Sequence, residues 1–191
     1  AGIKLKAAGV PFTIVERQSG VGGTWLANRY PGLRVDVANQ YYSYSFEPTN
    51  HWTHLYSEQP EILRYLEDVA ARHDILGHAR FDTAVTAATW NDDTSTWSVD
   101  VRGPGGEETL TARALICAVG QFSHPVIPNI EGASDFRGPA FHTADWRDDV
   151  DLAGKRVAVI GAGATGFQLV PAIAGVAAQV DVYQRTAQWM A

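Results

Sequence analysis

The chain has 191 residues, of which 46% are hydrophobic and 19% are charged, a balance typical of globular proteins. Its formal net charge of −6 argues against a general surface for nucleic acid or anionic membranes, but leaves room for local phosphate sites. Cys117 is the single cysteine, which excludes a disulfide framework and a CxxC redox pair. The sequence contains no long apolar run and no secretory signal, so we expect a cytoplasmic protein.

The chain starts with the predicted end of a helix. Residues 3–8 have helical spacing, Gly9 would stop the helix, and residues 12–15 predict a buried strand. A protein rarely begins halfway through a helix, and the only methionine is Met190. We therefore expect a fragment that lacks both ends of its parent.

An irregular segment and a longer helix come next. Residues 20–56 are rich in glycine and aromatic residues and show no sustained period. Residues 60–74 predict a helix, because Ile62, Leu66 and Val69 share one face.

Short strands are predicted after this helix. Residues 84–90 and 96–102 predict strands, residues 103–106 a glycine-rich turn, and residues 108–111 a returning strand. Together they would form a small antiparallel insertion. The continuous apolar run at residues 114–119 is typical of a strand buried on both faces.

The run VAVIGAGATG places a glycine-rich turn in a specific context. Residues 156–160 predict a buried strand, Gly161, Gly163 and Gly166 have G-x-G-x-x-G spacing, and an apolar helix follows. The first glycine permits a tight turn, the second lets the backbone approach a pyrophosphate, and the third lets the helix pack close to the strand. The free N–H groups and positive dipole end of the helix favour phosphate. We interpret this loop as a dinucleotide site rather than a simple turn.

The strand predicted at residues 179–183 indicates which dinucleotide is bound. It ends in Gln184, Arg185 and Thr186, where an NAD site would usually place an acidic residue. The planar guanidinium of Arg185 suits the 2′-phosphate of NADP. The sequence therefore favours NADPH, with a solvent-facing arginine as the alternative.

A second nucleotide site is predicted near the start of the chain. The run FTIVER places Glu16 at the end of a strand, where its carboxylate can bind two ribose hydroxyls, and the glycine-rich run GVGGTW follows at residues 20–25. Strand–helix–strand units thus bracket the chain. We expect an α/β fold with two Rossmann-like dinucleotide-binding domains, parallel sheets and a small antiparallel β insertion.

The run FRGPAFHTADW lies between the two predicted halves. Phe136, Gly138, His142 and Trp146 have the spacing F-x-G-x-x-x-H-x-x-x-W. With this fingerprint and the runs GVGGTW and NRYPGLRVD, the chain resembles the flavin-dependent Baeyer–Villiger monooxygenases of the flavin-containing monooxygenase superfamily along almost its whole length. It is most similar to the branch that acts on aryl and cyclic ketones such as hydroxyacetophenone.

The resemblance implies a division into domains. Residues 1–135 would form an FAD-binding domain without its first strand and first G-x-G-x-x-G, residues 136–154 the linker with the fingerprint, and residues 155–191 the start of an NADP-binding domain. Arg147 stands where that family usually has Pro or Asp after the tryptophan. The family's catalytic arginine would lie beyond Ala191, so the resemblance implies that this fragment alone is inactive.

The resemblance also implies which residues serve the cofactors. Asp36 would hold the nicotinamide and tune the missing arginine, and His142 would couple domain motion to the catalytic cycle, so these two are the catalytic candidates. The cofactor-binding positions that the resemblance implies are Glu16, Gly22, Gly23, Thr24, Trp25, Arg34, Val35, Asp36, Tyr42, Val85, Gly120, Gly161, Ala162, Gly163, Ala164, Thr165, Gly166, Phe167, Gln168, Gln184 and Arg185.

The reaction that the resemblance implies is insertion of one atom of O2 into a ketone. NADPH would reduce FAD, O2 would give a C4a-peroxyflavin, and attack on a small-molecule ketone would yield an ester or lactone. The alternatives are an N- or S-oxygenating flavin monooxygenase and, from another class, a non-catalytic nucleotide-binding fragment. No metal site is predicted, because His51 and His54 have no cysteine or close carboxylate to complete a zinc set. No nucleic-acid or membrane partner is predicted either.

Overall fold

The computed structural model describes residues 1–188, which fall into two compact units. Unit 1 contains residues 1–26 and 63–123, and unit 2 contains residues 27–62 and, within the described part of the chain, residues 124–188. The sequence had not indicated that residues 27–62 belong with the C-terminal part of the chain. The assignment of the chain to FAD, linker and NADP domains stays a prediction.

Unit 1 contains the first predicted helix and strand. Helix α1 (Gly2–Ala7) ends before Gly9, whose φ of +67° suits glycine. Strand β1 (Ile14–Val15) pairs in parallel with β2 (Ala79–Arg80). The predicted helix is confirmed, and the strand is shorter than residues 12–15.

The longest described helix is α3 (Gln59–Arg72), which confirms the helix predicted at residues 60–74. Its apolar face is buried, with Ile62 1% and Val69 2% exposed, because apolar residues three to four apart share a helix face. Among residues 1–188, no helix is both long and apolar enough to cross a membrane. The short 3-10 helices are η1 (Asn39–Tyr41), η2 (Leu76–His78), η3 (Ala133–Asp135) and η4 (Thr143–Asp145).

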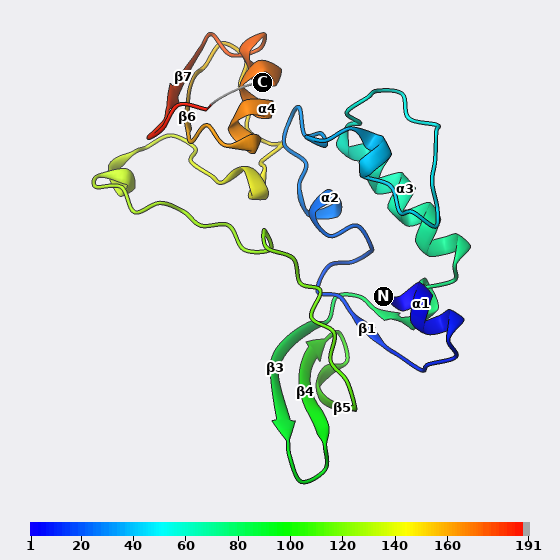
Figure 1. Ribbon diagram of the computed structural model, residues 1–191. Helices are drawn as coiled ribbons and strands as arrows, with labels where there is room; N and C mark the ends of the chain where they lie inside the picture. Colours follow the sequence, from blue (N-terminus) through cyan, green and yellow to red (C-terminus); the bar gives the residue numbers. More distant parts are fainter. Residues whose placement is uncertain (189–191) are drawn as a thin grey trace. The chain divides into compact units, whose positions relative to one another are not determined.

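A three-stranded antiparallel sheet follows in unit 1. Strands β3 (Ala84–Asn91), β4 (Thr96–Gly103) and β5 (Gly106–Ala112) lie in that order, joined by tight turns (Figure 1). Val99 and Val101 of the central strand are buried, because alternate residues of a strand face the same side. The predicted antiparallel insertion is confirmed.

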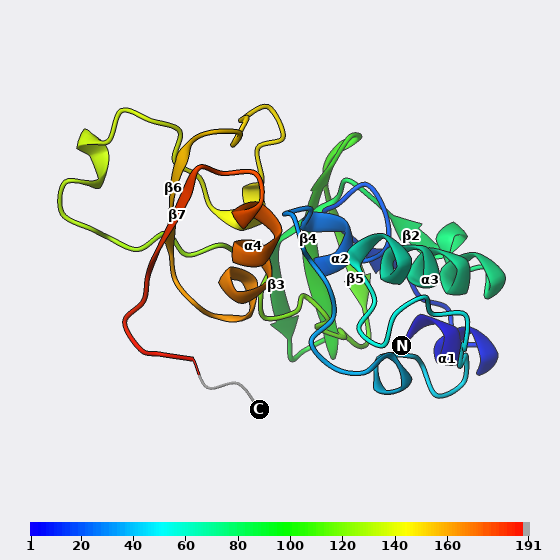
Figure 2. The ribbon, with the colours of Figure 1, turned by 90° about the horizontal axis from the view of Figure 1, so that it is seen from above.

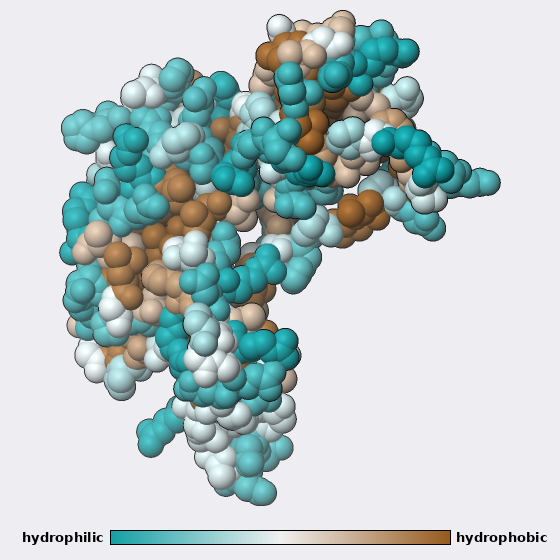
Figure 3. All heavy atoms as spheres, turned by 180° about the vertical axis from the view of Figure 1, so that it is seen from behind, coloured by the Kyte–Doolittle hydropathy of each residue, from teal (hydrophilic) through white to brown (hydrophobic). Residues whose placement is uncertain are grey.

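The strand predicted at residues 114–119 is not formed. This run is in no strand of the structure, and its side chains are accessible, with Ile116 57% and Val119 73% exposed. The prediction of a strand buried on both faces is therefore wrong here. An apolar run favours burial, but a buried strand also needs a neighbouring strand to pair with and other elements that cover both faces of the sheet. Figure 3 shows hydrophobic residues, in brown, at the surface of the face that it draws.

Unit 2 contains the second predicted strand–helix–strand element. Strand β6 (Arg156–Ile160) pairs in parallel with β7 (Gln179–Tyr183), and α4 (Ala164–Ala174) connects them and packs against both (Figure 2). All three elements confirm the prediction. The predicted burial of β6 is only partly correct, since Val159 is buried but Ile160 is 63% exposed. One helix on a two-stranded sheet cannot cover both faces.

Candidate functional site

The turn after β6 has the geometry that its glycine spacing predicts. Gly161 has a φ of +109°, and its N–H donates to the carbonyl of Tyr183 at 2.8 Å. Gly163 is the N-cap of α4. A Cβ at Gly166 would lie 2.4 Å from the carbonyl oxygen of Gly161, so glycine is what lets the helix approach the turn this closely.

The start of α4 is open to a ligand. Apart from its chain neighbours, a Cβ added at Gly161 or Gly163 would meet no described atom within 4 Å. No side-chain hydrogen bond caps the helix, and its first turn holds no acidic residue. There is therefore free space beside these two glycines, next to the backbone N–H groups and positive dipole end of the helix start, an arrangement that fits a phosphate.

The other predicted NADP positions lie in or after this turn. Gln184 and Arg185 follow β7 and are exposed. Because the Gly161 N–H binds the Tyr183 carbonyl, the end of β7 lies beside the first glycine. The positions in the turn and at the start of the helix are exposed or half-buried: Ala162, Ala164, Thr165 and Phe167.

Residues 30–36 form a second part of the site in unit 2. Val35 is 2% exposed, whereas Arg34 and Asp36 on either side of it are exposed. The Arg34 guanidinium donates to a carboxylate oxygen of Glu58 at 3.2 Å. Buried and exposed residues thus alternate along this segment. The buried Val35 side chain anchors it, and the charged side chains on either side stay accessible.

The side-chain amide of Gln168 joins this segment to α4. Its Nε2 donates to the Arg34 carbonyl at 2.8 Å, and its Oε1 accepts from the Arg34 N–H at 3.2 Å and from the Tyr30 hydroxyl at 3.2 Å. Gly32 has a φ of +82°, and a Cβ there would lie 2.5 Å from the Gln168 carbonyl oxygen. Two predicted cofactor positions, Arg34 and Gln168, are therefore in direct contact, which the sequence had not indicated.

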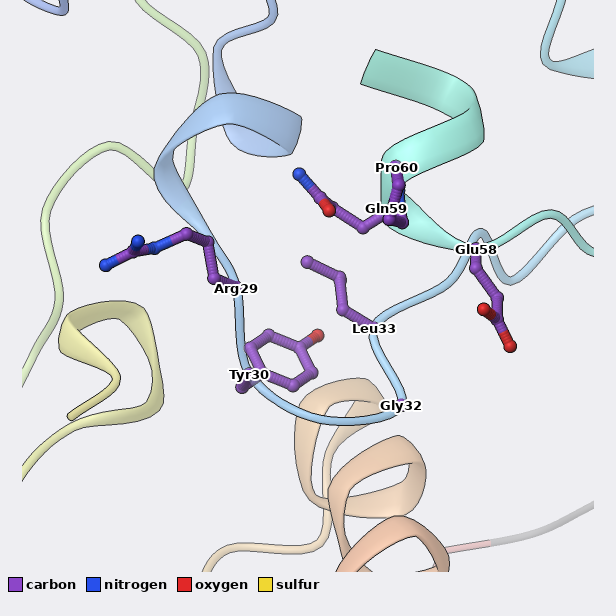
Figure 4. Close-up of a pocket in the computed structure, with 7 residues that line it drawn as sticks. All are labelled: Arg29, Tyr30, Gly32, Leu33, Glu58, Gln59 and Pro60. Atoms are coloured by element: carbon purple, nitrogen blue, oxygen red, sulfur yellow. The ribbon is translucent and has the colours of Figure 1, made fainter. Parts of the chain in front are cut away.

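Tyr30 is a functional candidate that the sequence reasoning missed. Burial raises the pKa of its phenol above the ordinary value of 10.0, a hydrogen bond with Thr165 opposes this, and the negative charge of Asp36 adds to it. The phenol therefore keeps its proton at neutral pH and can donate to Gln168. Beside it lies a pocket of about 220 Å³ (Figure 4), lined by Arg29, Tyr30, Gly32, Leu33, Glu58, Gln59 and Pro60.

Asn39 is a second residue that the sequence reasoning missed. It is 2% exposed, its Nδ2 donates to the Ser57 hydroxyl at 2.7 Å, and its Oδ1 accepts from the Ser57 N–H at 3.0 Å. These bonds satisfy a buried amide and fix the chain that follows Asp36. Tyr42, a predicted flavin contact, lies just beyond and is 41% exposed. An asparagine in a segment without periodicity carries no signal for burial.

The predicted FAD positions of unit 1 begin with Glu16. Its backbone follows β1, and its Oε1 accepts from the Gln18 N–H at 2.9 Å, which orients the carboxylate. Val85 lies in β3 at a bulge and is 49% exposed. Gly120 has a φ of +74° but ends no strand, since the preceding run is irregular.

The glycine-rich run of unit 1 forms a tight turn before a short helix, α2 (Thr24–Ala27). Gly22 has a φ of +126°, and a Cβ there would lie 2.5 Å from Leu63. Gly23 has a φ of +53°, and a Cβ there would meet nothing within 4 Å. Thr24 is exposed and Trp25 is buried. Gly22 therefore serves close packing, whereas Gly23 presents bare backbone.

The fingerprint residues lie in the irregular connection of unit 2. Nδ1 of His142 accepts a hydrogen bond from the Ala144 N–H at 3.1 Å and so caps η4. Trp146 packs edge-on against Phe141, with ring centroids 5.4 Å apart. Phe136 is 65% exposed. Its ring nevertheless lies against Gly138, where an added Cβ would be 2.6 Å from it. Local contacts thus account for all four fingerprint residues.

Known proteins resemble the chain along its whole length. Residues 12–191 match the family model "Flavin-binding monooxygenase-like". A Baeyer-Villiger monooxygenase of Streptomyces coelicolor is 41% identical, over 100% of this chain and 36% of the relative. One of Pseudomonas aeruginosa is 40% identical, over 98% and 35%. The chain thus spans about a third of the length of these curated relatives.

Solved structures of monooxygenases are also similar to almost the whole chain. The OTEMO complex with FAD and NADP is 38% identical with a TM-score of 0.89, and the match covers 98% of this chain and 37% of that one. Oxidized steroid monooxygenase bound to NADP is 42% identical with a TM-score of 0.87, covering 98% and 36%. The predicted α/β flavoprotein fold and the resemblance to Baeyer–Villiger monooxygenases are confirmed. The chain belongs to the flavin-binding monooxygenase-like family.

Proposed function

We propose that the whole protein is an NADPH- and FAD-dependent monooxygenase that inserts one oxygen atom of O2 into a small-molecule ketone, giving an ester or lactone. The observation that carries this proposal is the contact, within unit 2, between the helix of the phosphate turn and the segment with Arg34 and Asp36. Relatives named Baeyer-Villiger monooxygenase, and a similar structure with FAD and NADP, support the choice of reaction and cofactors.

The NADPH part of the proposal rests on the open start of α4. Its backbone N–H groups would bind the pyrophosphate, and Arg185 would pair with the 2′-phosphate. Asp36 is exposed on a segment that is held on the same helix, so its carboxylate would orient the nicotinamide. His142, which caps η4 in the fingerprint, would link movement of that connection to the reaction cycle.

The FAD part rests on unit 1. The Glu16 carboxylate, oriented by the Gln18 N–H, would accept hydrogen bonds from ribose hydroxyls, and the bare backbone at Gly23 would lie against the flavin. When bound, FAD takes a hydride from NADPH and activates O2. The residues of the chain would bind and orient the two dinucleotides.

The test is an isotope experiment on the whole protein. It is incubated with NADPH, ¹⁸O2 and a panel of aryl and cyclic ketones, one amine and one sulfide, and the products are identified by mass spectrometry. An ester or lactone with one labelled oxygen supports the proposal. Labelled N-oxide or sulfoxide alone would assign the protein to the heteroatom-oxygenating enzymes, and FAD binding without NADPH oxidation would mark a non-catalytic nucleotide-binding protein.

A further inference from the structure

We propose that Gln168 is a positioning residue, whose side-chain amide holds residues 30–36 on helix α4 and so fixes where Arg34 and Asp36 stand relative to the phosphate turn. The identity of the ligand in this inference rests on the proposed function. The contact itself does not, because it joins protein atoms only.

The amide pairs with both polar groups of one backbone residue. Nε2 of Gln168 donates to the Arg34 carbonyl at 2.8 Å, while Oε1 accepts from the Arg34 N–H at 3.2 Å. A side-chain amide has the same donor and acceptor as a peptide group, so this pairing fixes both position and orientation, as a neighbouring strand would. The buried Tyr30 hydroxyl adds a third hydrogen bond, at 3.2 Å to Oε1.

A glycine makes this contact sterically possible. A Cβ at Gly32 would lie 2.5 Å from the Gln168 carbonyl oxygen and 2.9 Å from Cβ of Ala172, one turn further along α4. Figure 4 shows the bend at Gly32 beside the orange helix α4. The segment therefore touches the helix backbone at Gly32 and is hydrogen-bonded to its side chain at Arg34.

The helix connects this contact to the phosphate turn. Gln168 lies four residues after Ala164, the first residue of α4, which corresponds to about 6 Å along the axis. A helix of this length is a rigid spacer. The amide can therefore set the distance from the phosphate-binding N–H groups to the two charged residues Arg34 and Asp36 without touching the dinucleotide.

The experiment measures hydrogen exchange of residues 30–36 in the whole protein without added NADPH. In Gln168→Leu we expect exchange about tenfold faster, because the Arg34 N–H loses its acceptor. Gly32→Ala should act in the same direction, because it separates the segment from α4 and leaves Gln168 intact. Tyr30→Phe is the matched control, which removes one hydroxyl but keeps the Arg34 pairing, so its effect should be smaller.

Gln168→Glu adds a pH test that distinguishes a side chain that forms hydrogen bonds from one that only fills space. An ionised carboxylate cannot donate to the Arg34 carbonyl, whereas a protonated one can. Protection of residues 30–36, relative to wild type, should therefore recover as the pH falls through the titration of this carboxyl, and Gln168→Leu should show no recovery. The other charged or titratable groups around the amide are Tyr30, the Arg34–Glu58 pair and Asp36, and wild type shares them all.

Stopped-flow mixing with NADPH completes the experiment. We expect Gln168→Leu to slow flavin reduction at saturating NADPH at least tenfold while changing the Kd for NADPH less than threefold. Unchanged exchange with a raised Kd would overturn the inference and make Gln168 a direct cofactor ligand. If wild-type protein shows the exchange pattern but its flavin is not reduced by NADPH, the proposed function fails and the positioning contact stands. Melting temperature and FAD content check that each variant is folded.

Discussion

Three glycine-to-alanine changes on one helix can separate binding from stability. At Gly163 the backbone has a φ of −69°, which alanine accepts, and a Cβ would meet nothing within 4 Å. At Gly166 a Cβ would lie 2.4 Å from the Gly161 carbonyl oxygen, whereas ordinary contacts begin near 3.4 Å. At Gly175, the C-cap, φ is −83° and a Cβ again meets nothing, so this change is the control.

The expected magnitudes follow from these distances. Gly166→Ala forces the helix and turn apart by roughly 1 Å and should destabilise the protein by about 1–3 kcal/mol. Gly163→Ala exchanges one N-cap residue for a poorer one and should cost less than about 1 kcal/mol. Its methyl group, however, stands where the pyrophosphate is proposed to bind. The Kd for NADPH should therefore rise at least tenfold, or about 1.4 kcal/mol.

The assays are thermal melting and isothermal titration with NADPH on the whole protein. We expect a lowered melting temperature for Gly166→Ala, a raised Kd with near wild-type melting for Gly163→Ala, and neither effect for Gly175→Ala. If Gly163→Ala binds NADPH with the wild-type Kd, no phosphate lies against this turn and the reasoning from its open geometry is refuted.

Three further outcomes are expected. Arg185→Ala should weaken NADPH binding roughly ten- to a hundredfold and leave NADH nearly unchanged, because it removes a charged partner of the 2′-phosphate; equal losses would contradict its role. Asp36→Ala should slow flavin reduction by NADPH in stopped-flow traces, and unchanged traces would remove it from the catalytic candidates. Since the pKa of Tyr30 is raised above 10.0 in the folded state, its stabilising contribution is present below pH 10 and lost as the pH rises through the folded value. Melting temperatures between pH 8 and 11 should therefore fall less for Tyr30→Phe than for wild type.

The elements that could be predicted from sequence are those whose pattern is local. The spacing of Ile62 and Val69 predicts helix α3, and the three glycines after β6 predict a strand, a tight turn and a helix, because each signal lies within one element. The strand prediction at residues 114–119 was wrong because a strand depends on residues outside the local pattern. The apolar residues of this run indicate burial, yet a strand also needs a paired neighbour, which a local pattern does not supply.

The site could be predicted only in part, for a similar reason. The phosphate turn is one continuous stretch, so its spacing identified it. The contact between Arg34 and Gln168 joins residues 134 positions apart, and the sequence around neither residue contains a pattern that predicts the contact. Tyr30 and Asn39 are buried polar residues in a segment without periodicity, where their burial and partners become visible only in the fold.

The hydrogen-bonding capacity of Gln168 limits how it can combine its two suggested roles. A glutamine amide offers an oxygen with two lone pairs and a nitrogen with two N–H groups. In this structure the oxygen already accepts two hydrogen bonds, from the Arg34 N–H and the Tyr30 hydroxyl, and the nitrogen donates one to the Arg34 carbonyl. One N–H is left for a dinucleotide. A direct contact through the oxygen would have to break a bond to the segment, so in this arrangement Gln168 can reach a dinucleotide only through its remaining N–H group.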